Sequence, residues 1–462
     1  MALTKVRYAM VNDPVTVNIR DFGAVGGGAD DTVAIQAAID SLNSYSGGRI
    51  YIPSGEWKFT NLTINVPVQI YGTQNQVSVL YTEEADGGIV YNHNQGISLK
   101  GVKFFGSASH TGSLITINGN VNGYNSGTRI ENCTFYNCFN GVNFADAGQM
   151  FISDCQFTTY RGSAVFINNA TTPDAGDGQI NSCIFSGSGT DGISIYQISA
   201  GGLKVSNNKF LGGEYHYFAD LANSVGTSIL VFDGNSSEFA NDTNIKFVAT
   251  NPASMPYIII TDNQLSVTSG KTGIDFAPSA VNRYYTIQIS DNNLNGEGSW
   301  TGMKFANVQG VNIGTNIMAT RGTTGGTGFS FGSGCSDIMF HRQDFANLST
   351  SYTGQSGVSG FTNRHQPNSY GAGESLSVTI TGTATDMLAQ GGIKDARLVL
   401  VADGTDGGFA LLGLTSTGVT SVSSTITNVT FAVSGGNLTG ITTGGSSSRI
   451  MYMVLLKTGY EL

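Results

Sequence analysis

The chain has 462 residues, with 22 Lys and Arg against 32 Asp and Glu and a formal net charge of -10 at pH 7. This acidic balance argues against a nucleic-acid partner, because phosphate backbones attract basic surfaces. Sixty-three glycines and eight prolines, with charged side chains at only 12% of positions, favour many short strands joined by tight turns over a helix-rich fold.

No apolar run is long enough to span a bilayer, and the start MALTKVRYAM lacks the hydrophobic core of a secretory signal. The sequence therefore predicts folding in a cytosol, without membrane insertion. Five cysteines, an odd number, fit reduced thiols better than a disulfide framework. No spacing of the HExxH, CxxC or EF-hand type occurs, so neither a metal nor another cofactor is predicted.

The first elements that we expect are a strand, a short helix and two further strands between residues 17 and 59. Asp30, Asp31 and Thr32 precede the helix, and we interpret the two aspartates as caps of its first amides, not as a catalytic dyad. After Gly47 and Gly48, residues 49–52 alternate as a strand, and residues 53–55 turn the chain into the next one. The apolar face of the helix comprises Val33, Ile35, Ala37, Ala38, Ile39 and Leu42.

A repeat follows, in which RIENCTFYNC, MFISDCQFTTY, GQINSCIFSGS and GLKVSNNKFLGG align, and YIIITDNQLSV and TIQISDNNLNG continue the series. Its period wanders between about 22 and 29 residues, which is typical of stacked coils with a constant strand and a variable loop. We therefore predict an all-β chain whose residues 17–350 form a parallel β-helix. One internal column would contain Cys133, Cys155, Cys183, Asn208, Asn263 and Asn292, and the other Phe135, Phe157, Phe185, Phe210, Leu265 and Leu294. We interpret the cysteines as packing residues, because they lack a His partner at ligand spacing.

Two segments resemble a known family. DFGAVGGGADDTVAIQAAID followed by GGRIYIPSGEW resembles the amino-terminal signature of the pectate-lyase-like right-handed β-helix superfamily, in which Asp is common at the position of Gly27. The preceding ALTKVRYAMVNDPVTVNIRDFGA resembles the leader of bacteriophage tailspikes and tail-associated polysaccharide depolymerases. This resemblance implies a right-handed coil, a virion protein assembled in the host cytoplasm, and attachment of residues 1–16 to a phage tail or baseplate protein.

After Ser349 the pattern loosens, and we expect a linker at 351–370. The strands ARLVLVA, FALLGL and MYMVLLK then predict a small β-sandwich over residues 371–462. The exposed edge of the last coil and the apolar long faces of the helix favour association of copies. By resemblance to tailspikes we expect a homotrimer, with the C-terminal domain serving in trimerisation or carbohydrate binding.

The segment LGGEYHYFAD, residues 211–220, gathers charge, histidine and aromatic rings in a chain poor in charge and histidine. Neighbouring coils project side chains at roughly 5 Å intervals, which is close to the carboxylate separations of glycosidases. An alignment on the aromatic column puts Arg161, Glu214 and Ala240 in one register, with Asp191, His216 and Asp242 two residues further on. The catalytic candidates are Glu214, Asp242, Glu238, Asp191 and His216. The alternative is a tyrosine-rich structural coil flanked by solvated turn aspartates.

Aromatic rings stack on sugar faces, and an arginine fork holds a carboxylate or phosphate. On these grounds we expect substrate contacts from Tyr160, Arg161, Tyr215, Tyr217, Asp220, Asp233, Arg283, Tyr284 and Trp300. For Arg161, a structural salt bridge is the alternative.

With the resemblance, these residues predict a tailspike depolymerase that cleaves a bacterial capsular or lipopolysaccharide glycan at the cell surface by endo-acting hydrolysis. The same residues permit β-elimination on a uronate glycan. In that reaction Arg161 neutralises the carboxylate, His216 removes a proton, and Tyr215 or Tyr217 protonates the leaving oxygen. A non-catalytic receptor-binding tail protein and a cellular pectate-lyase-like enzyme or epimerase are the remaining alternatives.

Overall fold

The computed structural model describes residues 14–354 apart from breaks at 120–126, 170–176, 189–190, 199–200, 222–228, 250–256, 280–281, 323 and 342. It also describes residue 358 and, beyond it, the backbone of the strands between residues 362 and 456. The chain divides into two compact units, Met1–Ser359 and Gly360–Leu462. In the described part, no helix is long and apolar enough to cross a membrane.

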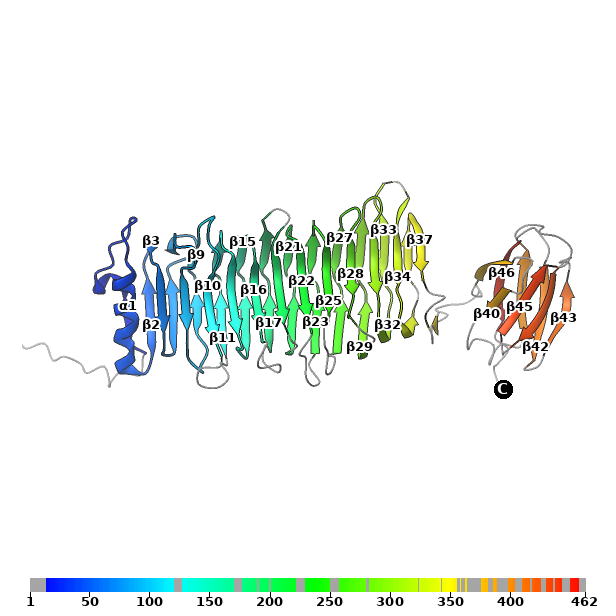
Figure 1. Cartoon of the computed structure of the whole chain (residues 1–462), viewed down its shortest axis with the longest axis horizontal. Coiled ribbons are helices and arrows are strands. Elements are labelled where there is room, and N and C mark those ends of the chain that lie inside the picture. The colour runs from blue at the N-terminus through cyan, green and yellow to red at the C-terminus, as the bar shows by residue number, and fades with distance from the viewer. Residues whose placement is uncertain are drawn as a thin grey trace, which may run out of the picture. The chain divides into compact units, whose positions relative to one another are not determined.

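The N-terminal unit is a stack of coils that each add one strand to three parallel sheets, which we name A, B and C (Figure 1). This confirms the predicted parallel β-helix. Sheet A contains β1 (Thr16–Asn18), β2 (Gly48–Ile52), β5 (Val68–Gly72), β8 (Ser98–Lys100), β11 (Thr128–Glu131), β14 (Met150–Ser153), β17 (Gly178–Asn181), β20 (Leu203–Ser206), β23 (Ile229–Asp233), β26 (Tyr257–Thr261), β29 (Asn282–Ser290), β32 (Val308–Ile313) and β35 (Ser336–Phe340). Sheet B contains β3 (Gly55–Lys58), β6 (Ser78–Tyr81), β9 (Lys103–Phe105), β12 (Thr134–Tyr136), β15 (Gln156–Tyr160), β18 (Ile184–Gly187), β21 (Lys209–Leu211), β24 (Ser236–Glu238), β27 (Gln264–Val267), β30 (Asn293–Gly296), β33 (Ile317–Thr320) and β36 (Asp344–Ala346). Sheet C contains β4 (Asn61–Ile64), β7 (Gly88–Tyr91), β10 (Ser113–Asn118), β13 (Asn140–Ala145), β16 (Ser163–Asn168), β19 (Ile193–Ile198), β22 (Tyr215–Asp220), β25 (Thr243–Val248), β28 (Thr272–Phe276), β31 (Thr301–Phe305), β34 (Gly325–Phe331) and β37 (Leu348–Thr353).

The predicted aromatic column is confirmed inside sheet B. Phe135, Phe157, Phe185 and Phe210 are buried, and the centroids of neighbouring rings are 4.8, 5.0 and 4.9 Å apart with nearly parallel planes. Phe104 stacks on Phe135 at 5.1 Å and extends the column by one coil. Burial of these rings in register fixes the pairing of the coils, because a one-residue slip would expose the whole column.

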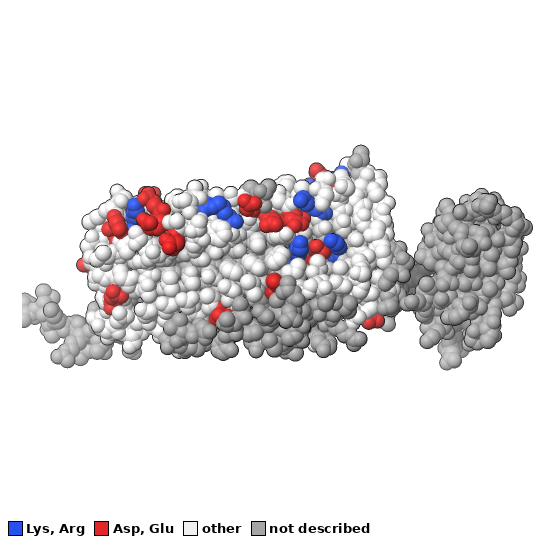
Figure 2. All heavy atoms as spheres, in the orientation of Figure 1, with Lys and Arg blue, Asp and Glu red and all other residues white. Residues whose placement is uncertain are grey.

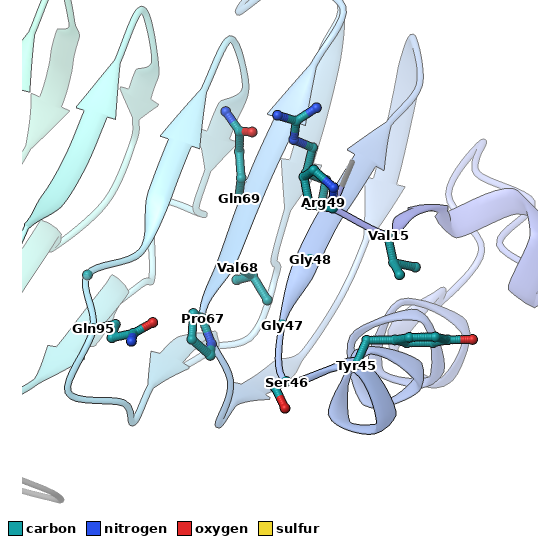
Figure 3. A pocket seen from close by; sticks show the side chains of 12 residues that line it. Val15, Tyr45, Ser46, Gly47, Gly48, Arg49, Pro67, Val68, Gln69 and Gln95 are labelled. Atoms are coloured by element: carbon teal, nitrogen blue, oxygen red, sulfur yellow. The ribbon is translucent and has the colours of Figure 1, made fainter. Parts of the chain in front are cut away.

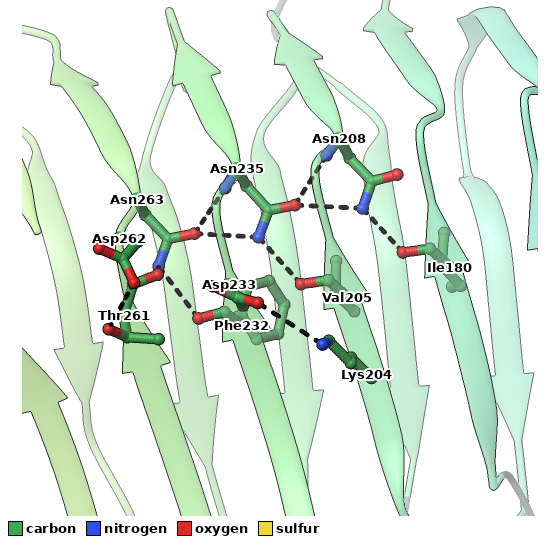
Figure 4. A network of polar contacts seen from close by, with 10 residues as sticks. All are labelled: Ile180, Lys204, Val205, Asn208, Phe232, Asp233, Asn235, Thr261, Asp262 and Asn263. Atoms are coloured by element: carbon green, nitrogen blue, oxygen red, sulfur yellow. Dashed lines mark hydrogen bonds and ion pairs between the residues drawn. The ribbon is translucent and has the colours of Figure 1, made fainter.

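The second internal column is also confirmed, and it is longer than the sequence suggested because Asn235 and Asn316 belong to it (Figure 4). The backbone N–H of Asn208 donates to Oδ1 of Asn235 at 3.0 Å, and that of Asn235 donates to Oδ1 of Asn263 at 3.0 Å. The side-chain amide of Asn235 donates in turn to the carbonyl of Val205, 3.0 Å away. The buried amides therefore satisfy the corner backbone of their neighbours.

The cysteines continue this ladder toward the N-terminus, since the N–H of Cys183 donates to Oδ1 of Asn208 at 2.9 Å. All five cysteines are buried and free of disulfides. The residue before each ladder position from Cys133 to Asn292 turns the corner from sheet A to sheet B in the left-handed conformation, which Asn, Asp and Gly adopt most readily. These corner residues are Asn132, Asp154, Ser182, Asn207, Gly234, Asp262 and Asp291.

The cap is close to the prediction, with two corrections. Helix α1 runs over Thr32–Ser41 between the 3-10 turns η2 (Ile19–Phe22) and η3 (Leu42–Tyr45), and its residues Ile35, Ala38 and Ile39 are buried. Val33 is 83% exposed, so its assignment to the apolar face was wrong. Asp30 accepts the N–H of Thr32 at the helix start, whereas Asp31 accepts N–H bonds from the preceding glycine-rich turn.

The C-terminal unit contains antiparallel strands. One sheet has the order β39-β46-β41-β42-β43 and the other β40-β45-β44. Their bounds are β39 (Ser375–Ile380), β40 (Thr385–Leu388), β41 (Leu398–Asp403), β42 (Phe409–Thr415), β43 (Gly418–Ser424), β44 (Val429–Ser434), β45 (Asn437–Thr442) and β46 (Arg449–Leu456). The three predicted apolar strands correspond to β41, β42 and β46. The sandwich packing and the domain boundaries stay a prediction, because the side chains of this unit lie outside the described residues.

Candidate functional site

The outer face of sheet C carries a continuous row of side chains, one from each coil, which we call the central row. Strand pairing aligns its members from β16 to β31. The row changes from aromatic to charged along the helix, and Figure 2 shows acidic and basic side chains close together on the viewed face. In chain order the members are Phe166, Tyr196, Phe218, Lys246, Asp275 and Lys304.

The aromatic end of the row forms a platform of four half-buried rings, Phe166, Tyr196, Tyr215 and Phe218. Phe166 stacks on Tyr196 with ring centroids 5.0 Å apart, and Tyr196 meets Phe218 edge-on at 5.2 Å. Tyr215 lies on the same strand as Phe218, and their ring centroids are 5.0 Å apart. Exposed rings held at coil spacing present the kind of surface on which sugar faces stack. We call these four residues the aromatic platform.

Two predicted carboxylates flank this platform on neighbouring coils. The N–H of Glu214 donates to the carbonyl of Gly192, and the N–H of Asp242 donates to the carbonyl of Glu214. Glu214 and Asp242 therefore occupy equivalent positions one coil apart, at a backbone spacing of about 4.8 Å. The predicted register, which paired Glu214 with Ala240 and His216 with Asp242, was wrong, because the turns that precede sheet C differ in length from coil to coil.

Tyr215 joins the two carboxylates. Its hydroxyl donates to Oδ2 of Asp242 at 2.7 Å, and Nζ of Lys246 lies 5.1 Å from the centroid of its ring. Partial burial, the hydrogen bond to Asp242 and the negative charges of Asp242 and Glu214 raise the pKa of Tyr215. Burial acts to raise the pKa of Asp242 as well, but the hydrogen bond from Tyr215 and the positive charges of Lys246 and Lys271 outweigh it and lower that pKa.

Asp275 is the functional candidate that the sequence analysis missed. Its side chain is only 6% exposed, and its Oδ1 has no hydrogen-bond partner. Burial raises the pKa of Asp275, and the charge of Asp242 adds to this effect, although Lys304 and Lys246 oppose it. Asp242 and Asp275 thus lie close enough to interact, and their pKa values are shifted in opposite directions. One signal in the sequence could have revealed it. If the segment TGIDFA is aligned with the strands that carry Lys246 and Lys304, Asp275 falls between these two lysines in the central row.

Four predicted site residues are interior, which corrects the sequence-based assignment, since a side chain inside the coil cannot touch a glycan. The hydroxyl of Tyr160 bonds Ser194, that of Tyr217 donates to Gln197, and Nε1 of Trp300 donates to Thr320. These three aromatic residues and His216 are at most 2% exposed.

His216 stacks on Phe210 with ring centroids 5.6 Å apart, and its two nitrogens face Ser237 and the carbonyl of Gly212. Burial lowers the pKa of His216 to about 3, although the hydrogen bond to Gly212 opposes the shift. A neutral, enclosed imidazole cannot serve as the predicted base.

Arg161 is used inside the fold, although not in the salt bridge considered from the sequence. Its guanidinium donates to the carbonyls of His110 at 2.7 Å and Ser107 at 3.2 Å, and to Oδ1 of Asn137 at 3.3 Å. These bonds hold the loop that follows β9. Three of its five N–H donors are used in this way, which favours a structural role, and the substrate contact of Arg161 stays a prediction.

The remaining predicted residues are distributed over several faces. Asp233 is on sheet A, 3.5 Å from Lys204, and Glu238 is on sheet B, 4.0 Å from Lys209, so neither joins the sheet C group. Asp220 ends β22 on sheet C and raises the pKa of Tyr196 together with burial, the larger cause.

Asp191 is exposed in the turn before β19. The side chains of Arg283 and Tyr284 lie outside the described residues. Among the described residues, no three His, Cys, Asp or Glu side chains converge in a manner suited to a metal ion.

Comparison with known proteins places this geometry in context. Residues 16–214 match the family described as rhamnogalacturonase A/epimerase, pectate lyase-like. Over 64 residues, 12% of this chain, the sequence is 47% identical to mannuronan C5-epimerase AlgE3 of Azotobacter vinelandii. Over 42 residues, 9% of this chain, it is 57% identical to alginate lyase 7 of the same organism. The matched segments span only 4% and 5% of the lengths of these two relatives.

Among solved structures, a mutant tailspike protein of E. coli bacteriophage HK620 in complex with a hexasaccharide superimposes with a TM-score of 0.53. The match covers 95% of this chain and 93% of the tailspike, at 12% sequence identity, so the likeness is one of fold. The family match over residues 16–214 and the three-sheet parallel coil of the described residues both agree with the resemblance of this chain to the pectate-lyase-like right-handed β-helix superfamily.

Proposed function

We propose that this protein is a tailspike-type depolymerase that binds a bacterial capsular or O-antigen polysaccharide along sheet C and cleaves it by glycoside hydrolysis. The observation that carries the proposal is the position of Asp242 and Asp275 on neighbouring coils of sheet C, where Asp242 binds Tyr215 of the aromatic platform and the two pKa values shift in opposite directions. A carboxyl with a raised pKa and a second with a lowered pKa match the acid and the base or nucleophile that glycoside hydrolysis requires.

In this mechanism the aromatic platform positions the sugar chain across neighbouring coils. Asp275, whose pKa is raised by burial, acts as the general acid and donates a proton to the leaving glycosidic oxygen. Asp242, kept ionised, attacks the anomeric carbon or activates a water that does so. Tyr215 is a positioning residue for Asp242 through the 2.7 Å hydrogen bond, and Glu214 is the second carboxylate beside Tyr215.

Hydrolysis is favoured over β-elimination by the positions of the groups that elimination would use. His216 is enclosed by the coil, and the guanidinium of Arg161 binds backbone carbonyls. The raised pKa of Tyr215 keeps its hydroxyl protonated near neutral pH, so Tyr215 does not replace His216 as the base. The matches to an epimerase and an alginate lyase keep elimination as the second candidate, and its specific support is the tyrosine hydroxyl that lies beside two carboxylates and Lys246.

The remaining parts of the proposal rest on the tailspike likeness and on the leader segment. They are a homotrimer, attachment of residues 1–16 to a phage tail or baseplate, and action at the bacterial surface. The C-terminal unit would then serve in trimerisation or carbohydrate binding.

The test is incubation of the protein with purified host capsule or lipopolysaccharide, with two readouts. New reducing ends without ultraviolet absorbance indicate hydrolysis, whereas absorbance from unsaturated uronates indicates elimination and contradicts the mechanism above. Neither signal, together with retained glycan binding, identifies a non-catalytic receptor-binding protein.

Variants then assign the residues. Asp242→Asn and Asp275→Asn should each remove most cleavage but leave glycan binding intact. Glu214→Gln tests whether the neighbouring carboxylate takes part, and unchanged turnover in that variant would remove Glu214 from the site. The matched control is Glu83→Gln, which neutralises an exposed carboxylate near the N-terminal cap that pairs with Lys58. Cleavage by the control should equal that of the unmodified protein.

A further inference from the structure

A recessed surface lies on the outer face of sheet A, whereas the candidate catalytic group lies on sheet C. Two hollows of about 750 and 410 Å³ adjoin there, since Arg49 and Gln69 line both of them. Figure 3 shows the side chains of Arg49 and Gln69 projecting side by side from neighbouring strands. The larger hollow extends past Tyr45 and Gln95, and the smaller one extends toward Tyr71 and Lys100. We call this surface the sheet A groove.

Strand register sets the order of groups along the groove. Arg49, Gln69, Ser98 and Arg129 follow one another on β2, β5, β8 and β11. Three steps separate the two arginines, which corresponds to about 14 Å between their backbones. Lys100 follows Ser98 by two residues on β8 and lies opposite Tyr71 of β5. Cations therefore border the groove along the direction of the helix axis.

The charge of this surface contrasts with that of the whole protein. The chain carries a net charge of -10, yet no Asp or Glu is among the residues that line the two hollows. The four ion pairs among the described residues join Lys58, Lys100, Lys204 and Lys209 to acids, and Arg49 takes part in none of them. Lys100 pairs with Glu131 at 3.3 Å, but both side chains are exposed, so that contact is weak and Lys100 stays available.

The uncharged groups of the groove suit a sugar. Tyr71 lies against Tyr51 with ring centroids 5.2 Å apart, so its ring is held in a fixed orientation. Gln69, Thr73 and Asn132 line the hollows and offer amide and hydroxyl groups to sugar hydroxyls. An aromatic ring, amides and arginine together match a ligand that carries hydroxyls and carboxylates.

We propose that the sheet A groove is a second, non-catalytic glycan site that takes an acidic oligosaccharide. In this site the Arg49 guanidinium binds a sugar carboxylate with two parallel hydrogen bonds, Lys100 pairs with a second carboxylate, and Tyr71 packs against a ring face. The site goes beyond the proposed cleavage on sheet C and does not depend on it. It gives an acidic protein a local means of holding an acidic polysaccharide.

The test uses the full chain and two probes, tetragalacturonate and its fully methyl-esterified, neutral form, with binding measured by isothermal titration calorimetry. The acidic probe should bind, the neutral probe should bind about tenfold more weakly, and the affinity for the acidic probe should fall as salt is raised. The double variant Arg49→Ala/Lys100→Ala should lose about tenfold in affinity or more. The matched control Lys204→Ala, which removes a cation elsewhere on sheet A, should retain the affinity.

Further measurements separate this site from the one on sheet C. Asp242→Asn should leave binding of the acidic probe to the groove unchanged, so that failure of the cleavage proposal does not affect this one. Loss of probe binding in Lys246→Ala, with no loss in the double variant, would place the acidic ligand on sheet C and overturn the inference. Absence of binding, or equal binding of both probes, also overturns it. A change of molecular mass by light scattering in the double variant, with probe binding unchanged, would identify the groove as an interface between copies.

Discussion

The asparagine ladder inside the coil and the carboxyl groups on the outer face of sheet C use polar side chains in opposite ways. Asn263 accepts the N–H of Asn235 and donates its amide to the carbonyl of Phe232, so its buried polar atoms are paired. Asp275 is almost as deeply buried, but one of its carboxyl oxygens has no hydrogen-bond partner.

The difference separates a polar group that stabilises the fold from one to which we assign a catalytic role in the proposed mechanism. A paired buried amide stabilises the corner of the coil, whereas an unpaired buried carboxyl costs stability and shifts its own pKa. Substitutions in the two regions should therefore have opposite consequences for activity and for stability.

The largest effect is expected from Asp275→Asn. Loss of the proton donor should lower kcat by roughly a hundredfold or more. Because burial raises the pKa of Asp275 in the folded protein, its ionisation opposes folding, and stability should decline as pH rises from 3.8 through that raised pKa. The neutral asparagine removes this decline, so the melting temperature near neutral pH should be equal to or above that of the unmodified protein. If Asp275→Asn were both inactive and strongly destabilised, Asp275 would also be needed for the fold, which would contradict its contrast with the asparagine ladder.

Asn263→Ala should do the reverse. It leaves the buried N–H of Asn235 and the carbonyl of Phe232 without partners, which we expect to lower the free energy of unfolding by about 2 to 4 kcal/mol. Urea denaturation measures the change, and kcat below the unfolding transition should be retained. The matched control is Asn75→Ala, a half-buried asparagine whose amide donates to the side chain of Asn132, and we expect it to change stability by less than about 1 kcal/mol.

Tyr215→Phe should have an intermediate effect confined to the pH profile. Removal of the hydroxyl takes away a hydrogen bond that lowers the pKa of Asp242, so that pKa should rise. The acid limb of the activity profile should then move to higher pH, while the alkaline limb, which depends on Asp275, stays in place. Tyr257→Phe on sheet A serves as the control and should not move either limb. An unshifted acid limb in Tyr215→Phe would show that Asp242 does not set it.

The smallest effect is expected from His216→Gln and concerns acid stability alone. The folded-state pKa of His216, about 3, is below its ordinary value of 6.5, so the unfolded chain binds the extra proton first. The contribution of His216 to stability is therefore complete above pH 6.5 and is lost as pH falls toward 3. Melting temperatures between these pH values should decline less steeply in the variant. Cleavage should persist, and its loss would restore His216 as a catalytic candidate.

The two internal columns could be predicted from the sequence because, in each coil, the interior residues follow the corner between sheets A and B after the same number of residues. Cys183 and Phe185 are separated by one residue, as are Asn208 and Phe210, and stacking requires residues of similar size at each step. The cap could also be predicted, because its helix and its glycine turn are each encoded by neighbouring residues in the sequence.

The site could be predicted only in part, for two physical reasons. The turns into sheet C differ in length, so Gly192 lies seven residues after Phe185 but Glu214 lies four residues after Phe210. In addition, strands such as β22 bury two successive residues, here His216 and Tyr217. A prediction that side chains alternate strictly between the inner and outer faces of the sheet therefore places one of them on the outside. Asp275 was missed because no local pattern distinguishes it, and only its strand neighbours reveal its surroundings.

The left-handed corner between sheets A and B has a consequence for how such a protein changes over time. Because seven successive corners, from Asn132 to Asp291, share this form, the corner holds each of these rungs in place regardless of what happens at the opposite edges. Insertions between sheets B and C can therefore alter the rim of the sheet C face in one rung without displacing the rungs above and below. Over many generations, single loops on this rim could then be exchanged while the scaffold stays constant.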